Sequence, residues 1–268
     1  MAKPIALTIA GSDPSGGAGI QADLKTFAAF DVYGAAVLTA LTAQNTRGVD
    51  GVFPIPADFI AQQIASVASD LDVRAIKTGM LGDKITVEAV ADAISRHRLQ
   101  PLVVDPVMVA TSGDVLLAAD AVEAVRDTLL PLADIITPNL HEAAILSGTS
   151  PARSTDEMAE QGHRLLAFGC KAVLVKGGHG SGEAIDVLVT AEGVRQYTLA
   201  RIDTRHTHGT GCTLSAAIAA GLAQAMPLAN AVGNAKSFVW HALQAGRTLG
   251  VGGGNGPLDH GTPWPRNQ

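Results

Sequence analysis

Short apolar runs alternate with helical patterns along most of this chain, and this alternation limits the fold more than any other feature. The runs predicted as strands cover residues 5–10, 35–43, 73–78, 102–104, 134–137 and 171–176. The predicted helices cover residues 20–27, 58–69, 83–97, 120–130, 155–168, 211–224 and 228–245. Such an alternation favours an α/β protein with a doubly wound, mostly parallel sheet.

The C-terminal third departs from this pattern in two places. Residues 185–189 and 194–198 alternate in polarity around a short polar segment, which is typical of a hairpin. Residues 250–268 are rich in glycine and proline, so we expect a flexible loop and tail there. Because no linker or internal repeat interrupts the chain, we expect one domain over residues 1–268, a common size for α/β domains.

Composition excludes several classes of function. With 47% hydrophobic and only 16% charged residues, the chain has the makeup of a compact globular protein. The net charge of −6 and the lack of a basic run argue against nucleic-acid binding. We find no apolar stretch of the length a membrane span needs, and the apolar run at residues 5–10 is too short for a signal peptide. We therefore expect a cytoplasmic protein with reduced cysteines.

The stretch from residue 203 to residue 220 is a glycine-rich loop that opens a helix of small residues. Gly209, Thr210 and Gly211 lie where the first amide groups of a helix point outward, an arrangement that binds anions. Cys212 falls in the first helical turn, where the helix dipole favours the thiolate. A plain strand-to-helix turn around a buried cysteine is the alternative. A zinc site is disfavoured, since no second pair of ligands lies nearby.

Polar residues follow several predicted strands. The loop 11–19 is glycine-rich but has neither the P-loop nor the dinucleotide-binding spacing, so it indicates backbone contact with a small ligand or an exposed turn. Gln44 follows the 35–43 run and could pair with an aminopyrimidine-like edge, or be an ordinary loop amide. Asp105 ends a buried strand, where open sheets bind ligands, although Asp before proline also starts turns.

Three further residues belong to the same pattern. Asn139 and Glu142 have the spacing of a helix N-cap with an acidic first turn, and Glu142 could alternatively lie near Mg²⁺ or its water shell. Lys176 ends the 171–176 strand and could hold a phosphate as a point charge.

Taken together, these segments resemble the hydroxymethylpyrimidine/phosphomethylpyrimidine kinases of thiamin biosynthesis, which belong to the ribokinase-like superfamily. The resemblance covers nearly the whole chain in order. It rests on residues 10–26, 40–46, 77–81, 104–108, 137–143, 175–179 and 207–213.

The resemblance implies a three-layer αβα sandwich, usually a homodimer, that phosphorylates 4-amino-5-hydroxymethyl-2-methylpyrimidine and then its monophosphate with MgATP. By motif matching, the pyrimidine is read by Gln44, with Gly11, Asp23, Met80 and Val107 around it. Asp105, Asn139 and Glu142 serve the metal and the phosphates, with Asp105 and Glu142 expected at Mg²⁺. Lys176 contacts the nucleotide phosphates, and residues 209–212 form the anion hole.

Two positions depart from the family pattern. His206 stands where an Asn is expected, and the loop 250–257 lacks the histidines expected between its glycines. Both departures bear on the nucleotide edge and the C-terminal loop rather than on the catalytic residues.

Related sugar kinases carry an Asp base at the position of Cys212. Phosphoryl transfer asks little of a base, and a phosphate monoester nucleophile is already anionic near neutral pH. Our hypothesis is that Cys212 assists the first phosphorylation more than the second. The rival activities are a pyridoxine, pyridoxal or pyridoxamine kinase and, from another class, a non-catalytic pyrimidine-binding regulator.

Overall fold

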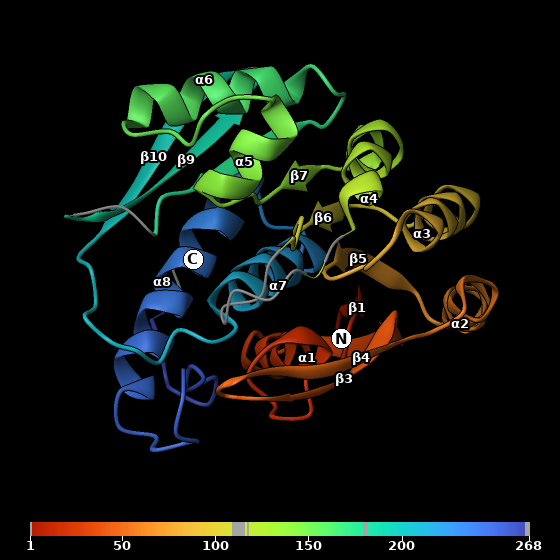
Figure 1. The fold of residues 1–268 in the computed structure, drawn as a ribbon, viewed down its shortest axis with the longest axis horizontal. Helices are drawn as coiled ribbons and strands as arrows, with labels where there is room; N and C mark the ends of the chain where they lie inside the picture. Colours follow the sequence, from red (N-terminus) through yellow and green to blue (C-terminus); the bar gives the residue numbers. More distant parts are fainter. Residues whose placement is uncertain (1, 109–115, 117, 179–181, 266–268) are drawn as a thin grey trace.

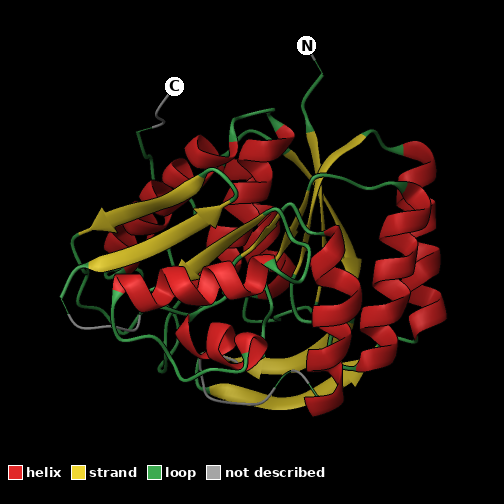
Figure 2. Cartoon of the chain, turned by 90° about the horizontal axis from the view of Figure 1, so that it is seen from above, coloured by secondary structure: helices red, strands yellow, loops and turns green. Residues whose placement is uncertain are grey.

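A central sheet lies between two layers of helices (Figures 1 and 2). The computed structural model describes residues 2–108, 116, 118–178 and 182–265. Within them, the sheet has eight strands in the order β10-β9-β8-β7-β6-β5-β1-β2. The strands are β1 (Ile5–Ala10), β2 (Tyr33–Leu38), β5 (Val73–Thr78), β6 (Leu102–Val104), β7 (Ile135–Ile136), β8 (Ala172–Lys176), β9 (Ala184–Thr190) and β10 (Gly193–Leu199). This is the predicted three-layer αβα sandwich.

The sheet is parallel from β2 to β8, and the hairpin of β9 and β10 continues it in antiparallel fashion. Because the chain passes from β1 outward to β2 and later returns to the other side of β1 with β5, the winding direction changes beside β1. Ligands of open α/β sheets bind at the carboxyl ends of the strands near such a switch point.

Successive side chains of the strands face opposite helix layers, which gives the molecule two cores. Leu7 and Ile76 pack on one face, whereas Ala6 and Ala75 pack on the other. The first core is covered by α2 (Ala57–Asp70), α3 (Lys84–His97), α4 (Ala119–Ala124), α5 (Leu140–Ser147) and α6 (Thr155–Leu166). The second is covered by α1 (Gly19–Ala29), α7 (Thr210–Ala223) and α8 (Leu228–Gly246). Apolar residues on both strand faces explain why the strands read as continuous apolar runs.

The prediction of one buried strand over residues 35–43 is wrong. The chain leaves the sheet at Thr39, and a separate two-stranded hairpin follows, made of β3 (Ala40–Asn45) and β4 (Gly48–Pro54). Along β3, exposed Leu41 alternates with half-buried Thr42 and Gln44. An unbroken apolar composition signals burial, but the polar residues at alternate positions are the mark of a half-exposed strand.

The helix predicted over residues 120–130 is also not uniform. α4 passes into a π-helical turn, Val125–Leu129, and then into a 3₁₀ turn, Leu130–Leu132. Pro131 lies in this last turn and has no N–H to donate, so it cannot continue a regular helix.

Part of the C-terminal segment for which we predicted a flexible loop and tail packs against the body of the molecule. Leu258 and His260 are buried, and the Trp264 ring lies 4.7 Å from Phe30 and 5.3 Å from Phe238, centroid to centroid. Residues 266–268 lie outside the described part of the chain. Glycine and proline therefore mark irregular backbone here, while scattered apolar side chains anchor it.

The glycine-rich loop 250–257 contacts both the β3–β4 hairpin and the loop before α7. Asn255 N donates to the carbonyl of Thr46 (2.7 Å), at the tip of the hairpin. A β-carbon on Gly256 would overlap the His206 ring. The two positions that depart from the family pattern are thus neighbours in space.

Candidate active site

The polar residues singled out in the sequence collect at the carboxyl edge of the parallel sheet. Gly11 follows β1, Met80 lies just beyond β5, Asp105 follows β6, Asn139 lies just beyond β7 and Lys176 ends β8. The amino-terminal end of α7 lies against the same edge, because a β-carbon on Gly211 would be 3.4 Å from Lys176 Nζ and 3.7 Å from Asp105 Oδ2.

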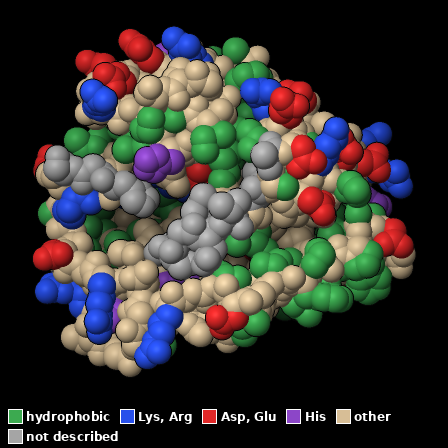
Figure 3. Space-filling view, in the orientation of Figure 1, with side chains coloured by type: hydrophobic (Ala, Val, Ile, Leu, Met, Phe, Trp, Pro, Cys, Tyr) green, Lys and Arg blue, Asp and Glu red, His purple; other side chains and the backbone are tan. Residues whose placement is uncertain are grey.

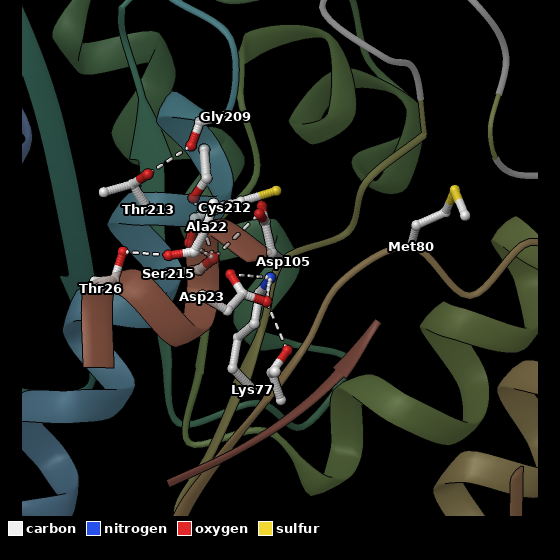
Figure 4. A network of polar contacts seen from close by, with 12 residues as sticks. Ala22, Asp23, Thr26, Lys77, Met80, Asp105, Gly209, Cys212, Thr213 and Ser215 are labelled. Atoms are coloured by element: carbon white, nitrogen blue, oxygen red, sulfur yellow. Dashed lines mark hydrogen bonds and ion pairs between the residues drawn. The ribbon is translucent and has the colours of Figure 1, made fainter. Parts of the chain in front are cut away.

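Lys176 and Asp105 form the polar centre of this edge (Figure 4 shows the Asp105 side). Lys176 Nζ donates to Asp105 Oδ1 at 3.0 Å. Thr137 Oγ1 donates to the same oxygen (3.2 Å), and Ser215 Oγ donates to Oδ2 (3.1 Å). Burial would raise the pKa of Asp105, but the charges of Lys176 and Lys77 outweigh it and lower that pKa. Asp105 is therefore an anion, held in place by three side chains.

Glu142 is a second carboxylate beside the same lysine. Its Oε2 lies 4.0 Å from Lys176 Nζ and accepts a hydrogen bond from Asn139 N (2.7 Å). Burial and the nearby charge of Asp105 raise the pKa of Glu142 to about 7, although Lys176 opposes this. Two buried carboxylates share one ammonium group, so the cluster carries more negative than positive charge whenever Glu142 is ionised.

Asn139 and Glu142 also cap α5, as one of the two interpretations of their spacing predicted. Asn139 Oδ1 accepts from the backbone N–H groups of His141 (2.9 Å) and Glu142 (3.0 Å), which completes a capping box. This cap fixes the Glu142 carboxylate toward Lys176. A contact of Asn139 with a nucleotide stays a prediction.

A second lysine–aspartate pair lies beneath the site (Figure 4). Lys77 Nζ donates to Asp23 Oδ2 at 2.8 Å and to Oδ1 at 3.0 Å, and both side chains are 0% exposed. Thr8 Oγ1 donates to Asp23 Oδ2 (2.6 Å). Burial opposes the charge of Lys77, but Asp23, Cys212 and Asp105 outweigh it and raise its pKa. Asp23 was expected around the pyrimidine; its side chain has no exposed surface, and a contact with the pyrimidine stays a prediction.

The start of α7 has the geometry expected of an anion hole. Gly209 is the N-cap with φ of +83°, a left-handed conformation that favours glycine. Within the described part of the chain, the non-helical backbone hydrogen bonds include none from Gly211 N or Cys212 N, whereas Thr210 N donates to Thr207 O. Among the described residues, these two amides at the positive end of the helix thus have no backbone acceptor, and Gly211 lies beside Lys176.

Cys212 differs from the expectation of a thiolate. Its side chain keeps partial exposure. Desolvation nevertheless raises the pKa of the thiol to about 11, with Asp23 and Asp105 adding to the shift and Lys77 opposing it. Because the surrounding carboxylates and burial outweigh the helix dipole, Cys212 is a neutral thiol at pH 7.

The residues expected around the pyrimidine come from separate elements. Gln44 Oε1 accepts from Thr42 Oγ1 (3.1 Å), which also donates to Ser12 O (2.8 Å), so the hairpin is tied to the first glycine loop. A β-carbon on Gly11 would overlap the end of the Met80 side chain. Met80 lies apart from the polar network in Figure 4.

A cavity of about 320 Å³ opens beside Met80 and is lined by Thr39, Ala40, Val52, Pro54, Leu81, Gly82, Asp83, Leu116 and Ala118. Neither Gln44 nor Val107 lines it, and Val107 instead borders a water-sized space near Asp105. The pyrimidine-binding roles of Gln44, Gly11, Met80 and Val107 stay predictions.

Sequence reasoning gave no role to several residues of the site. Lys77 and Ser215 sit inside runs that looked like plain core, and both prove to be buried partners of acids. Asp13 and His208, 195 residues apart in the chain, form a buried pair at 2.8 Å. A lysine within an apolar strand was the one signal that could have been used, because buried lysines are rare unless paired.

The surface and the helices add two facts. Figure 3 shows basic and acidic side chains interspersed over this face of the described chain, unlike the single-sign surface typical of nucleic-acid binding. Among the described helices, none combines the length and apolar character needed to cross a bilayer.

Parallel strands that deliver carboxylates and a lysine to a helix N-terminus, in a fold that matches solved vitamin kinases, place the chain among the small-molecule kinases of the ribokinase-like class. The chain belongs to the phosphomethylpyrimidine kinase family, whose model matches residues 13–259. The hydroxymethylpyrimidine/phosphomethylpyrimidine kinase of Rhizobium meliloti is 53% identical over 97% of this chain and 98% of its own length.

Solved structures agree with this assignment. An ADP complex of Bacillus subtilis pyridoxal kinase has a TM-score of 0.89 and 40% identity, over 97% of this chain and 98% of that one. Phosphomethylpyrimidine kinase from Clostridium difficile has a TM-score of 0.81 and 42% identity, over 90% of this chain and all of that one.

Proposed function

We propose that this chain is an ATP-dependent kinase that phosphorylates 4-amino-5-hydroxymethyl-2-methylpyrimidine and then the resulting monophosphate, as part of thiamin biosynthesis. The observation that carries this proposal is the juxtaposition of Lys176 and two carboxylates with the open amides of Gly211 and Cys212. The names of close relatives over the full chain give the substrate.

In the first reaction, the hydroxymethyl oxygen attacks the γ-phosphorus of ATP. A P–O bond forms there, the bond to ADP breaks with the electron pair leaving on ADP, and the hydroxyl proton is released to water. Charge on the transferred oxygens is best stabilised by fixed donors that need no reorganisation. The amides of Gly211 and Cys212 and the ammonium of Lys176 are such donors.

Asp105 and Glu142 have the chemistry of a magnesium site. Their oxygens are the hard ligands that Mg²⁺ takes, and the surplus negative charge around Lys176 suits a cation. Within the described residues, no group of three or more His, Cys, Asp or Glu could hold a metal, so the ion would rely on water and phosphate oxygens as well. Bound Mg²⁺ would neutralise charge on the nucleotide phosphates.

An assay of ADP release tests the proposal directly. Purified protein is given hydroxymethylpyrimidine and MgATP, and the product is identified by mass spectrometry to count the phosphates. ADP release with formation of the diphosphate supports the proposal, whereas no ADP release with this alcohol contradicts it. The same protein in light scattering tests the homodimer that the family resemblance implies.

Pyridoxal kinase activity is the second candidate, because a solved pyridoxal kinase matches this chain at a TM-score of 0.89. Another ring that bears a hydroxymethyl group could use the same phosphate-binding residues. Turnover of pyridoxal and hydroxymethylpyrimidine under identical MgATP ranks the two activities.

A further inference from the structure

Two glycine loops from opposite ends of the chain meet at the amino-terminal end of α7. The first is the loop 11–19 after β1, and the second is the loop 207–212 that forms the anion hole. A side chain on Gly209 would overlap the carbonyl of Gly17, and one on Gly17 would overlap the His208 ring. The fit between the loops leaves room for glycine alone at these two positions.

Asp13 organises the first loop from within. Its Oδ1 accepts from Ser15 N (2.9 Å) and Ser15 Oγ (2.7 Å), and its Oδ2 accepts from Gly17 N (3.1 Å) and Ala18 N (2.8 Å). The carboxylate is only 2% exposed. Although burial would raise the pKa of Asp13, the bonds from His208 and Ser15 lower it to about 2. Asp13 is therefore a buried anion that fixes the backbone of this loop.

His208 joins that anion to the second loop. Its Nε2 lies 2.8 Å from Asp13 Oδ2, and its backbone N donates to Gly256 O at 3.1 Å. His208 directly precedes Gly209, the N-cap of α7. At its far end, the first loop presents the N–H of Gly19 to Cys212, where it lowers the pKa of the thiol. One residue, His208, thus connects the first loop through its ring and the C-terminal loop through its backbone, and it lies in the anion-hole loop itself.

We propose that Asp13 and His208 are a positioning pair, which sets the distance between the anion hole at residues 209–212 and the first glycine loop without touching the reacting atoms. The inference rests on the proposed kinase function. Because donors of an anion hole act only at a fixed geometry, loosening this contact slows phosphoryl transfer more than it weakens substrate binding.

Steady-state kinetics of His208→Ala separate positioning from binding. We expect kcat with hydroxymethylpyrimidine to fall by about 10- to 100-fold, the cost of a small misplacement of reacting groups. The KM values for the pyrimidine and for MgATP should stay near those of the wild type. His208→Gln, which keeps a donor toward Asp13, should recover most of the lost kcat. His241→Ala is the matched control, because that histidine lies on α8 and contacts its own helix at Ser237 O.

Alkylation of Cys212 tests the same contact without any turnover. Peptide mass spectrometry follows iodoacetamide labelling of Cys212, with buried Cys170 as the internal reference. His208→Ala should speed labelling of Cys212 by at least about threefold, as expected of a locally loosened segment. A wild-type protein without kinase activity would contradict the proposed function. The labelling rates would still test whether Asp13 and His208 position the anion-hole loop.

Several outcomes would overturn the inference. One is that His208→Ala leaves both kcat and the labelling rate of Cys212 unchanged. Another is that His208→Ala raises KM and leaves kcat unchanged. If His208→Ala does not fold, His208→Gln and Asp13→Asn carry the test. A low kcat in Asp13→Asn together with a near wild-type kcat in His208→Gln supports the positioning role of the pair. A wild-type kcat in both variants contradicts it.

Discussion

Two buried lysine–aspartate pairs flank the start of α7, and they differ in how completely they are closed. Lys77 and Asp23 are 0% exposed, and Lys77 bonds to both carboxylate oxygens of its partner. Lys176 is 14% exposed, reaches one oxygen of Asp105, and shares its charge with Glu142 at 4.0 Å. The first pair is closed to solvent, whereas the second is open on one side.

This difference separates two functions of a buried charge. A closed pair cannot exchange its partner for a ligand, so Lys77 and Asp23 act as scaffold and set the electrostatic surroundings of Cys212. An open pair with surplus carboxylate can turn its ammonium toward a phosphate while a cation balances the acids. Burial of a charged pair therefore does not by itself indicate a ligand-binding site, whereas a buried lysine that is incompletely paired does.

The largest effect is expected from the closed pair, on stability. Lys77→Met leaves Asp23 buried without its partner, which should lower the free energy of unfolding by about 3–5 kcal/mol. Urea denaturation measures this change. The double variant Lys77→Met/Asp23→Asn should recover part of the loss, because it removes the stranded charge. Equal stability of the single and double variants would refute the scaffold role.

The open pair should affect turnover more than folding, because Asp105 keeps Thr137 and Ser215 as donors when Lys176 is removed. Lys176→Met removes one phosphate donor, so we expect kcat to fall by about 10²- to 10³-fold, as for the loss of one such donor elsewhere. Lys171→Met is the matched control, since Lys171 lies just before the same strand in an exposed pair with Asp134. If both variants turn over alike, the comparison between the two pairs fails.

A neutral contact on the same helix provides a reference for the two charged pairs. Thr213 Oγ1 lies 2.9 Å from His260 Nε2, and burial, with the charge of Lys25, lowers the pKa of His260 to about 4. The unfolded chain therefore takes up a proton before the folded one, and stability falls as pH drops from about 6.5 to 4.

The fall attributable to His260 should be about 3 kcal/mol over that range. Unfolding of the wild type and of His260→Gln, measured at several pH values, gives the difference. Parallel pH profiles for the two proteins would show that folding does not lower the pKa of His260.

The smallest effect is expected at Cys212. As a neutral thiol it is a weak base, so Cys212→Ala should slow the first phosphorylation by about tenfold, below the usual range for a general base. The second phosphorylation should change little, because its nucleophile is already anionic. Cys170→Ala serves as the control. If Cys212→Ala slows both phosphorylations by the same factor and leaves substrate affinity unchanged, this role is excluded.

Much of the fold could be predicted from the sequence. Strands buried on both faces read as apolar runs, and the helices that cover them read as helical periods. The capping box of Asn139 and Glu142 was predictable for the same reason, since both partners lie within one helical turn. The break at Thr39 was not, because composition reports burial and not the direction in which a strand leaves the sheet.

The site was predictable only in part. Asp105 and Lys176 could be expected at one edge, since parallel strands end together. The Asp13–His208 contact spans 195 residues, and nothing in local sequence encodes such a distance. The raised pKa of Cys212 depends first on burial and then on the opposing charges of Lys77, Asp23 and Asp105, a balance that only the folded arrangement defines.

The separation of the β3–β4 hairpin from the main sheet has a consequence for how such enzymes diversify. Gln44 is carried by the hairpin, whereas Lys176, Asp105 and the start of α7 belong to the layered body. If Gln44 contacts the substrate ring as predicted, exchange of a few hairpin residues changes the ring that is accepted and leaves the phosphoryl-transfer residues untouched. Vitamin kinases with different substrates could arise on one catalytic body by replacement of this small module.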